Sequence, residues 1–295
     1  MPTYLNGYTL LDKVRKLLNE HSTAYVQGTD TTGKYSNDQI MEGINAANRY
    51  LYSLLLPRIP YHFEAETTLA GVASVYTLPA DFGILRYFKD SDGHQIFPVR
   101  PDQRRLASQS GSDQLYYRQG NTLVRDKASI TETCTLIYYK KVLDIDQGIS
   151  SAGGALSLAL ATSAKKIVDY YNGITIENVT DDWVDTISDY TAARVATIGT
   201  ETGAASKYYG TVSSIPEPFH FLIIPRAIFE ITGNYPVVQE KPQGGGKTFW
   251  DEQFLAALKA YAGAAKDTYP EDIWTQYGGA KGGGVSIPGQ GYDIR

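Results

Sequence analysis

The sequence predicts an α+β fold: a small bundle of about four helices, a β-rich insertion, a second inserted β domain and an extended C-terminal arm. Three observations support this prediction. Apolar residues recur at three- and four-residue steps in four segments, which is the helical period. Residues 61–142 and 147–215 instead hold β-prone runs between turns marked by glycine or proline. Residues 267–295 are rich in glycine and lack any period, which is typical of an extended segment.

Helices are expected at residues 9–20, 36–56, 219–232 and 248–266. The second has the clearest start, because Ser36 and Gln39 form a capping-box pattern in which each side chain bonds a backbone N–H group. Its apolar face comprises Ile40, Ile44, Ala47, Leu51 and Leu54 or Leu55. Pro57 and Pro60 end this helix, because proline cannot continue the hydrogen-bond ladder.

The other three helices have simpler end signals. Thr9 is expected to cap the first helix, with Arg15 on its solvent-facing side. The third is expected to bend at Pro225 and to end at Gly233, because glycine readily adopts the left-handed conformation found at helix ends. Thr248 is expected to cap the fourth. The apolar face of that helix comprises Trp250, Phe254, Leu258, Tyr261 and Ala265.

Between the second and third helices the sequence first predicts a β meander, at residues 61–142. Turns are expected at residues 79–82 (Pro-Ala-Asp-Phe), 91–93 (Ser-Asp-Gly) and 119–121 (Gln-Gly-Asn), because these residue types favour turn conformations. Thr133–Lys140 is the most β-prone run of the meander.

A second β domain is expected after the meander, as a small barrel or sandwich. Residues 147–154 are small, polar and rich in glycine, which favours a flexible linker. Turns are expected at 171–173 and 189–193, and residues 214–218 return the chain to the helices. We therefore expect a helical core at 1–146 and 216–266, an inserted β domain at 147–215 and a C-terminal arm at 267–295.

The composition argues against several classes of function. A formal net charge of −5 provides no overall basic field to attract nucleic acid. We expect no N-terminal signal peptide, and the longest apolar run is too short to cross a membrane. The single cysteine, Cys134, excludes an intrachain disulfide and is expected to lie in the core.

The motifs predict neither catalysis nor a cofactor or metal site. Residues 244–248 (Gly-Gly-Gly-Lys-Thr) resemble part of a phosphate loop but lack its first glycine, so a linker and helix start are favoured. Aspartates 181, 182, 185 and 189 lack the spacing of a calcium loop and are expected to form a solvated acidic face. The histidines at 21, 62, 94 and 220 have no zinc-ligand spacing.

A long helix, two prolines, a strand and the corner Tyr76-Thr77-Leu78-Pro79-Ala80-Asp81-Phe82 follow one another in this order. The pattern resembles the podovirus-type head-to-tail connector (adaptor) proteins of tailed bacteriophages, over roughly residues 9–88 and 219–266. Residues 147–215 resemble a small β module that recurs in phage structural proteins. This second resemblance rests on Asp-Tyr-Tyr-Asn-Gly at 169–173, Ile-Ser-Asp-Tyr at 187–190 and Ala-Arg-Val-Ala-Thr-Ile at 193–198.

The resemblance implies a structural virion protein rather than an enzyme, with no cofactor and no membrane partner. Such proteins form a homo-oligomeric ring of about twelve copies at the head–tail interface, closed by repeated contacts between neighbours. The ring would be assembled in the host cytoplasm and would join the portal protein to the tail nozzle or tube. Genomic DNA would pass through its channel without specific binding. Residues 147–215 would face outward, toward fibres, tailspikes or the capsid.

Two groups of residues are candidate contacts within this picture. The C-terminal arm would bind the portal through side chains spaced along it, namely Ile273, Trp274, Tyr277, Val285, Ile287, Pro288 and Tyr292. Arg100, Arg104 and Arg105 lie within residues 86–127, which hold eight basic and five acidic residues. This arginine cluster is expected to contact acidic groups of the next subunit or another partner, since nothing in it resembles base recognition.

An alternative hypothesis is a tail-associated binding module whose β domain recognises a glycan or a fibre. Aromatic side chains could provide stacking surfaces for sugar rings. The candidates are Tyr170, Tyr171, Trp183, Tyr208 and Tyr209. Polysaccharide binding by the 147–215 fragment alone would favour this hypothesis over the adaptor.

Overall fold

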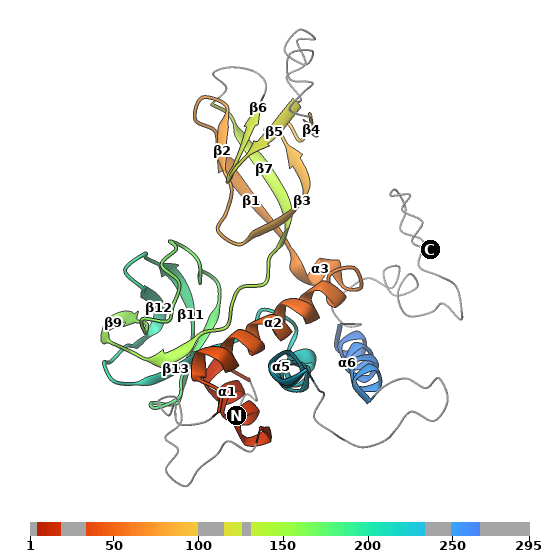
Figure 1. The fold of residues 1–295 in the computed structure, drawn as a ribbon. Coiled ribbons are helices and arrows are strands. Elements are labelled where there is room, and N and C mark those ends of the chain that lie inside the picture. The colour runs from red at the N-terminus through yellow and green to blue at the C-terminus, as the bar shows by residue number, and fades with distance from the viewer. Residues whose placement is uncertain (1–4, 19–33, 100–114, 126–130, 234–248, 266–295) are drawn as a thin grey trace, which may run out of the picture.

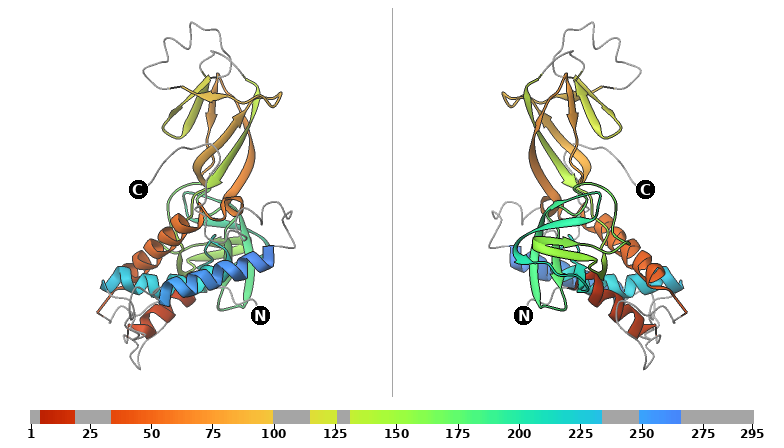
Figure 2. Two further views of the ribbon diagram at one scale, coloured as in Figure 1. Left: turned by 90° about the vertical axis from the view of Figure 1, so that its right-hand side faces the viewer. Right: turned by 90° about the vertical axis from the view of Figure 1, so that its left-hand side faces the viewer.

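The computed structural model describes residues 5–18, 34–99, 115–125, 131–233 and 249–265. It confirms the predicted α+β class, with helices gathered at the base of the molecule and two separate β units attached to them (Figure 1). Both side views show the upper β unit projecting away from the helices (Figure 2).

The helices form what we call the helical body. Its elements are α1 (Gly7–Leu17), α2 (Asn37–Leu55), α3 (Pro60–Phe63), a 3-10 helix η2 (Glu217–Leu222), α5 (Ile223–Thr232) and α6 (Phe249–Ala265). The predicted capping box at Ser36 and Gln39 is confirmed at the start of α2. The predicted apolar residues of α2 are completely buried, with the exception of Leu54, which is partly buried.

Close packing of α2 against α5 depends on a glycine in the middle of α2. A Cβ atom at Gly43 would lie 2.6 Å from Cγ1 of Ile231 and 3.3 Å from the backbone oxygen of Ala227. The two helices can therefore approach only because residue 43 has no side chain. Buried residues of α1, α2, η2, α5 and α6 form one continuous apolar core around this contact.

The upper β unit contains β1 (Glu64–Ala70), β2 (Val75–Thr77), β3 (Phe82–Lys89), β4 (Phe97–Pro98), β5 (Leu115–Gln119), β6 (Thr122–Arg125) and β7 (Thr133–Lys140). These strands form two sheets, ordered β1-β7-β3 and β2-β6-β5-β4. The predicted strand Thr133–Lys140 and the predicted turns at 79–82, 91–93 and 119–121 are confirmed. Cys134 is buried between the sheets, as expected.

The second β unit, here called the β module, contains β8 (Gln147–Ile149), β9 (Ala152–Ala159), β10 (Thr175–Asn178), β11 (Trp183–Tyr190), β12 (Val195–Thr202) and β13 (Tyr208–Thr211). They form one sheet in the order β8-β13-β10-β11-β12-β9, curled into a half-barrel (Figure 1). Its core contains the buried rings of Tyr171 and Tyr190, packed edge to face at 4.9 Å. The predicted turn at 171–173 is confirmed by Gly173 with φ +77°.

The expectation of a flexible linker at residues 147–154 is wrong, because this segment contains β8 and the start of β9. Its glycines are sites of close approach rather than of flexibility. A Cβ atom at Gly148 would lie 2.5 Å from Cβ of Ala161, and one at Gly153 would lie 2.3 Å from the backbone nitrogen of Ala204. Glycine in a strand therefore allows the neighbouring chain to pack against the backbone here.

Two expectations for α1 are also wrong. Asn6, not Thr9, caps the helix, and the Thr9 N–H donates to Oδ1 of Asn6 at 2.9 Å. Arg15 does not face solvent but is completely buried. Its guanidinium donates to Oδ1 of Asn37 and to the backbone oxygen of Tyr35, so these contacts replace the water that a buried charge loses.

Two further boundaries differ from expectation. The third helix was expected to bend at Pro225, but Pro225 lies in the first turn of α5, where proline is tolerated because no backbone N–H is needed. The change from 3-10 helix to α-helix occurs before it, at Leu222–Ile223. The expected end at Gly233 is confirmed by its left-handed conformation. The turn expected at 189–193 begins later, since β11 continues to Tyr190.

Candidate assembly site where the helices meet the β module

Polar side chains of α2 bind the chain segment that leads from the upper β unit to the β module, residues 140–146. The Tyr52 hydroxyl donates to the backbone oxygen of Lys140 at 2.6 Å. Asn45 binds both backbone groups of Ile145, accepting from its N–H at 2.7 Å and donating to its oxygen at 3.1 Å. Residues three or four apart share one helix face, so α2 presents these groups as a single row.

Asn48 lies between these two contacts and joins both connections of the β module to α2. Its amide donates to the backbone oxygen of Leu143 at 3.1 Å, and its oxygen accepts from the Ser213 hydroxyl at 2.6 Å. Leu143 precedes the β module, whereas Ser213 follows it. Asn48 is completely buried, so both bonds are protected from water.

The start of α1 also contacts this module, next to the segments that α2 binds. The side-chain amide of Asn6 donates to the carboxylate of Glu177 on β10, and Asn6 forms a β-bridge with Val212. The rings of Tyr8 and Tyr208 pack 5.2 Å apart. Contacts from α1 and α2 therefore fix the β module against the helical body.

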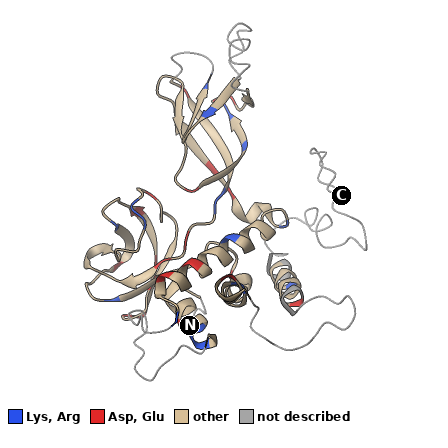
Figure 3. Ribbon diagram, viewed as in Figure 1, with Lys and Arg blue, Asp and Glu red and all other residues tan. Residues whose placement is uncertain are grey.

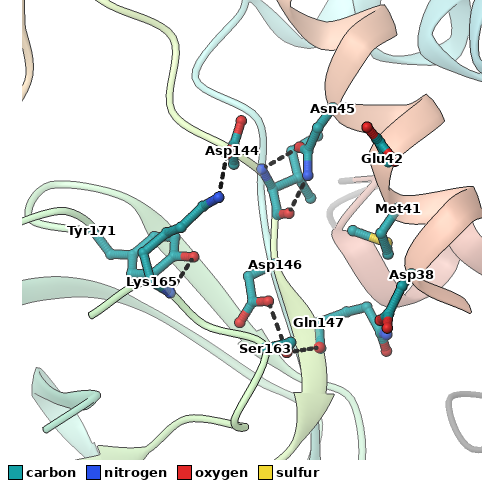
Figure 4. A pocket seen from close by; sticks show the side chains of 11 residues that line it. Asp38, Met41, Glu42, Asn45, Asp144, Asp146, Gln147, Ser163, Lys165 and Tyr171 are labelled. Carbon is teal, nitrogen blue, oxygen red and sulfur yellow. Dashed lines mark hydrogen bonds and ion pairs between the residues drawn. The ribbon is translucent and has the colours of Figure 1, made fainter. Parts of the chain in front are cut away.

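A pocket of about 200 Å³ lies between α2 and the β module (Figure 4). It is lined by Asp38, Met41, Glu42, Asn45, Asp144, Ile145, Asp146, Gln147, Ser163, Lys165 and Tyr171. Four of these residues carry carboxyl groups and one carries an amine. The Lys165 amine is already paired with Asp144 at 3.1 Å, and Asp144 also pairs with Arg49. The pocket is consequently acidic.

Asp146 is the most buried carboxyl group of the pocket, with 7% of its surface exposed. It accepts hydrogen bonds from the hydroxyl groups of Tyr209, at 2.7 Å, and Ser163, at 3.2 Å. Burial raises the pKa of Asp146 from 3.8 to about 6, because removal of water disfavours the charged form more than these bonds favour it. Burial and the nearby Asp146 also raise the pKa of Tyr209, so its hydroxyl remains a donor.

This raised pKa predicts a pH-dependent stability. The pKa of Asp146 is higher in the folded state than its ordinary value of 3.8, so protonated Asp146 contributes its full stabilisation below pH 3.8. This stabilisation is lost as the pH rises through about 6. We expect the unfolding free energy of the native chain to fall by about 3 kcal/mol relative to Asp146→Asn over this interval. Urea unfolding of both proteins between pH 4 and pH 7 measures the difference. A difference in unfolding free energy that stays constant between pH 4 and pH 7 would contradict the prediction. Asp189→Asn, at an exposed position, is the control.

The candidate contacts predicted from the sequence lie outside the described residues. These are the arginine cluster (Arg100, Arg104 and Arg105), the arm residues Ile273 to Tyr292, Thr248 and the Gly-Gly-Gly-Lys-Thr segment. Of the expected aspartate face, Asp181, Asp182 and Asp189 are exposed, and Asp185 is partly exposed. Asp181 also binds Lys207, and Asp185 accepts backbone N–H groups of Thr200 and Glu201. No group of three or more His, Cys, Asp or Glu residues in the described part of the chain is placed to hold a metal ion.

The structure removes the basis of the glycan-binding alternative. Tyr209 is completely buried, and Tyr171 and Tyr170 are 1% and 8% exposed. All three rings belong to the core of the β module and present no face to a sugar. Tyr208 packs against Tyr8. Of the five aromatic residues proposed to stack on sugar rings, this leaves Trp183, which is partly exposed.

Sequence reasoning missed the row of polar side chains on α2 and the pocket beside it. A signal was present, because Asn45 and Asn48 lie next to the apolar positions of a strongly amphipathic helix. Buried asparagines are retained where they bond backbone groups, so such positions indicate a contact with another segment. The sequence does not identify that segment.

The described residues form a helical body with two β units fixed to it, and no helix among them is long and apolar enough to span a membrane. An architecture of this kind offers several surfaces for assembly with other proteins. The family model for the SU10 adaptor protein matches residues 5–273, which is most of the chain. This protein belongs to the SU10 adaptor protein family, and it is a structural adaptor of a bacteriophage virion. A search of curated proteins found no match.

Proposed function

We propose that this chain is a podovirus-type head-to-tail adaptor that closes into a ring, of about twelve copies, between the portal protein and the tail nozzle or tube. The family match over residues 5–273 carries this proposal, because it includes the helical body and both β units. Genomic DNA passes through the channel of the ring. A net charge of −5 suits this passage, since a strongly basic channel would retain DNA.

Each part of the chain has its own role in this proposal. Residues 1–146 and 216–266 form the body that contacts neighbouring copies, and residues 147–215 form a separate unit on the outside of the ring. The outer unit contacts fibres or tailspikes. Its fixed attachment to α1 and α2, through Asn6 and Asn48, supports this role because a load on the outer unit is transmitted to the ring.

The C-terminal arm, residues 267–295, binds the portal. Its apolar side chains are separated by glycines, which suits an extended segment that fills pockets on a partner. The arm follows α6, which packs on the helical body through Phe254 and Ala257. The described helix that precedes the arm is therefore held on the body.

Deletion of residues 267–295 tests the role of the arm. We expect the shortened chain to fold normally but to lose co-sedimentation with the cognate portal, with binding weakened at least about a hundredfold. A triple variant Trp274→Ala, Ile287→Ala and Tyr292→Ala should show most of the same loss. The matched control is Ile167→Ala and Val168→Ala, which removes apolar groups exposed on the β module. Undiminished portal binding by the shortened chain would overturn the proposed role.

A further inference from the structure

Two histidine rings hold the segment that leads from the β module back to the helices, residues 213–216. Nε2 of His220, on η2, lies 2.7 Å from the backbone oxygen of Ile215. Nε2 of His62, on α3, lies 3.3 Å from the backbone oxygen of Ser214. A backbone oxygen can only accept, so each Nε2 carries the hydrogen. We call these two rings and residues 213–216 the histidine joint.

The histidine joint brings three parts of the molecule together. α3 leads directly into β1 of the upper β unit, and residues 213–216 follow β13, the last strand of the β module. Nδ1 of His62 also lies 3.5 Å from the hydroxyl group of Tyr261 on α6. A change at the two rings therefore reaches α6 and both β units.

The surroundings of His220 suit its neutral form. The residue is 3% exposed, and within the described part of the chain its second ring nitrogen, Nδ1, is buried with no hydrogen-bond partner. Burial lowers the pKa of His220, and the backbone of Ile215, the Glu217 carboxylate and the backbone of Ser213 oppose this effect only in part. A proton on Nδ1 would need an acceptor that the present geometry does not provide.

Charged groups from other elements act on the joint. Glu217 on η2 favours the charged form of His220, whereas His62 disfavours it. Lys140, at the end of β7, disfavours the charged form of His62 and also pairs with Asp81 at 3.8 Å. Figure 3 shows basic residues at the point where the chain leaves the upper β unit. Protonation of both rings therefore adds two positive charges next to an existing one.

We propose that the histidine joint is an acid-sensitive hinge. Protonation of His220 and His62 displaces residues 213–216 and weakens the attachment of α6 and of the upper β unit to the remaining helices. The two charged rings repel each other, and the new N–H of His220 finds an acceptor only when this segment moves. Histidine suits such a role because its charge changes near neutral pH. The hinge does not depend on the proposed ring.

The direction of the pH effect distinguishes the hinge from the acidic pocket. The stability that neutral His220 contributes is present above pH 6.5 and is lost as the pH falls, because its pKa is lower in the folded state. The stability that Asp146 contributes changes in the opposite direction. Acid therefore weakens the segment that leaves the β module while it strengthens the side chain contacts of the segment that enters it.

Hydrogen exchange of the full-length chain at pH 7.5 and pH 5.0, corrected for the intrinsic pH dependence of exchange, tests the hinge. At pH 5.0 we expect exchange to rise at least about threefold in residues 60–66, in residues 213–222 and in α6, but not in β10 and β11. The variant with His62→Gln and His220→Gln keeps an N–H donor at each position but does not titrate. Its exchange should show no such rise.

His94→Gln is the matched control, because His94 is exposed on a turn of the upper β unit and lies outside the joint. This variant should keep the full rise in exchange. Titration of the native chain followed by NMR needs no variant, and the ring signals of His220 should shift together with the backbone signals of residues 213–216. The hinge is refuted if exchange is unchanged at pH 5.0, if it rises equally in β10 and β11, or if the double glutamine variant shows the native rise.

Discussion

Replacement of Phe219 by alanine is expected to lower the unfolding free energy by about 3–5 kcal/mol. Phe219, on η2, is completely buried in the apolar core of the helical body, against α6. Its ring centroid lies 5.8 Å from that of Phe254 and 6.1 Å from that of Tyr261, both on α6. The substitution therefore removes apolar contact area and leaves a cavity that the surrounding rings cannot fill.

Phe221 offers a matched control two residues away on the same 3-10 helix, because 41% of its surface is exposed. Phe221→Ala should cost less than about 1 kcal/mol, since little burial is lost. Urea denaturation followed by circular dichroism compares the two variants. Hydrogen exchange should also show faster exchange in α6 for Phe219→Ala alone. Equal destabilisation by the two substitutions would show that Phe219 does not hold α6 on the body.

The second large effect is expected at Asn48, whose replacement by alanine should cost about 3 kcal/mol. The substitution leaves the backbone oxygen of Leu143 and the hydroxyl of Ser213 without their partner in a site that excludes water. Each unsatisfied buried polar group costs about 1–3 kcal/mol. Because these two groups lie on the two connections of the β module, we also expect faster hydrogen exchange in residues 140–146 and 211–215.

Arg49, the next residue of α2, provides the control for this prediction. Its side chain is 52% exposed and pairs with Asp144. An exposed ion pair contributes at most about 1 kcal/mol, so Arg49→Ala should change stability little. Equal losses for Asn48→Ala and Arg49→Ala would indicate that the buried bonds of Asn48 do not hold the β module in place.

The features that the sequence predicted well depend on neighbouring residues. The capping box at Ser36 and Gln39 spans three positions, and the apolar face of α2 repeats every three or four residues. The turn at 119–121 and the strand Thr133–Lys140 are likewise specified by local residue types. Local hydrogen bonding and side-chain period decide such elements, so they can be read without the tertiary structure.

The features that the sequence did not reveal depend on residues far apart in the chain. The bond from Asn48 to Leu143 spans 95 positions, and the bond to Ser213 spans 165. Arg15 was placed on the surface because long cationic side chains usually lie there, yet contacts with Asn37 bury it. The glycines of residues 147–154 indicated flexibility, although their role is to admit a neighbouring strand or loop.

The same distinction applies to the candidate site. The acidic pocket combines α2 residues with Asp144, Asp146, Gln147 and Lys165, which follow α2 by about a hundred positions. Only the fold brings them together. The arginine cluster, by contrast, is close together in the chain and was identified from the sequence.

Native mass spectrometry of the purified full-length chain, alone and with its cognate portal, tests the central claim most directly. The account predicts a closed complex in which a fixed number of copies, about twelve, is bound to one portal ring. A chain that remains monomeric in the presence of portal, or binds it in a variable number of copies, would contradict the proposed adaptor ring.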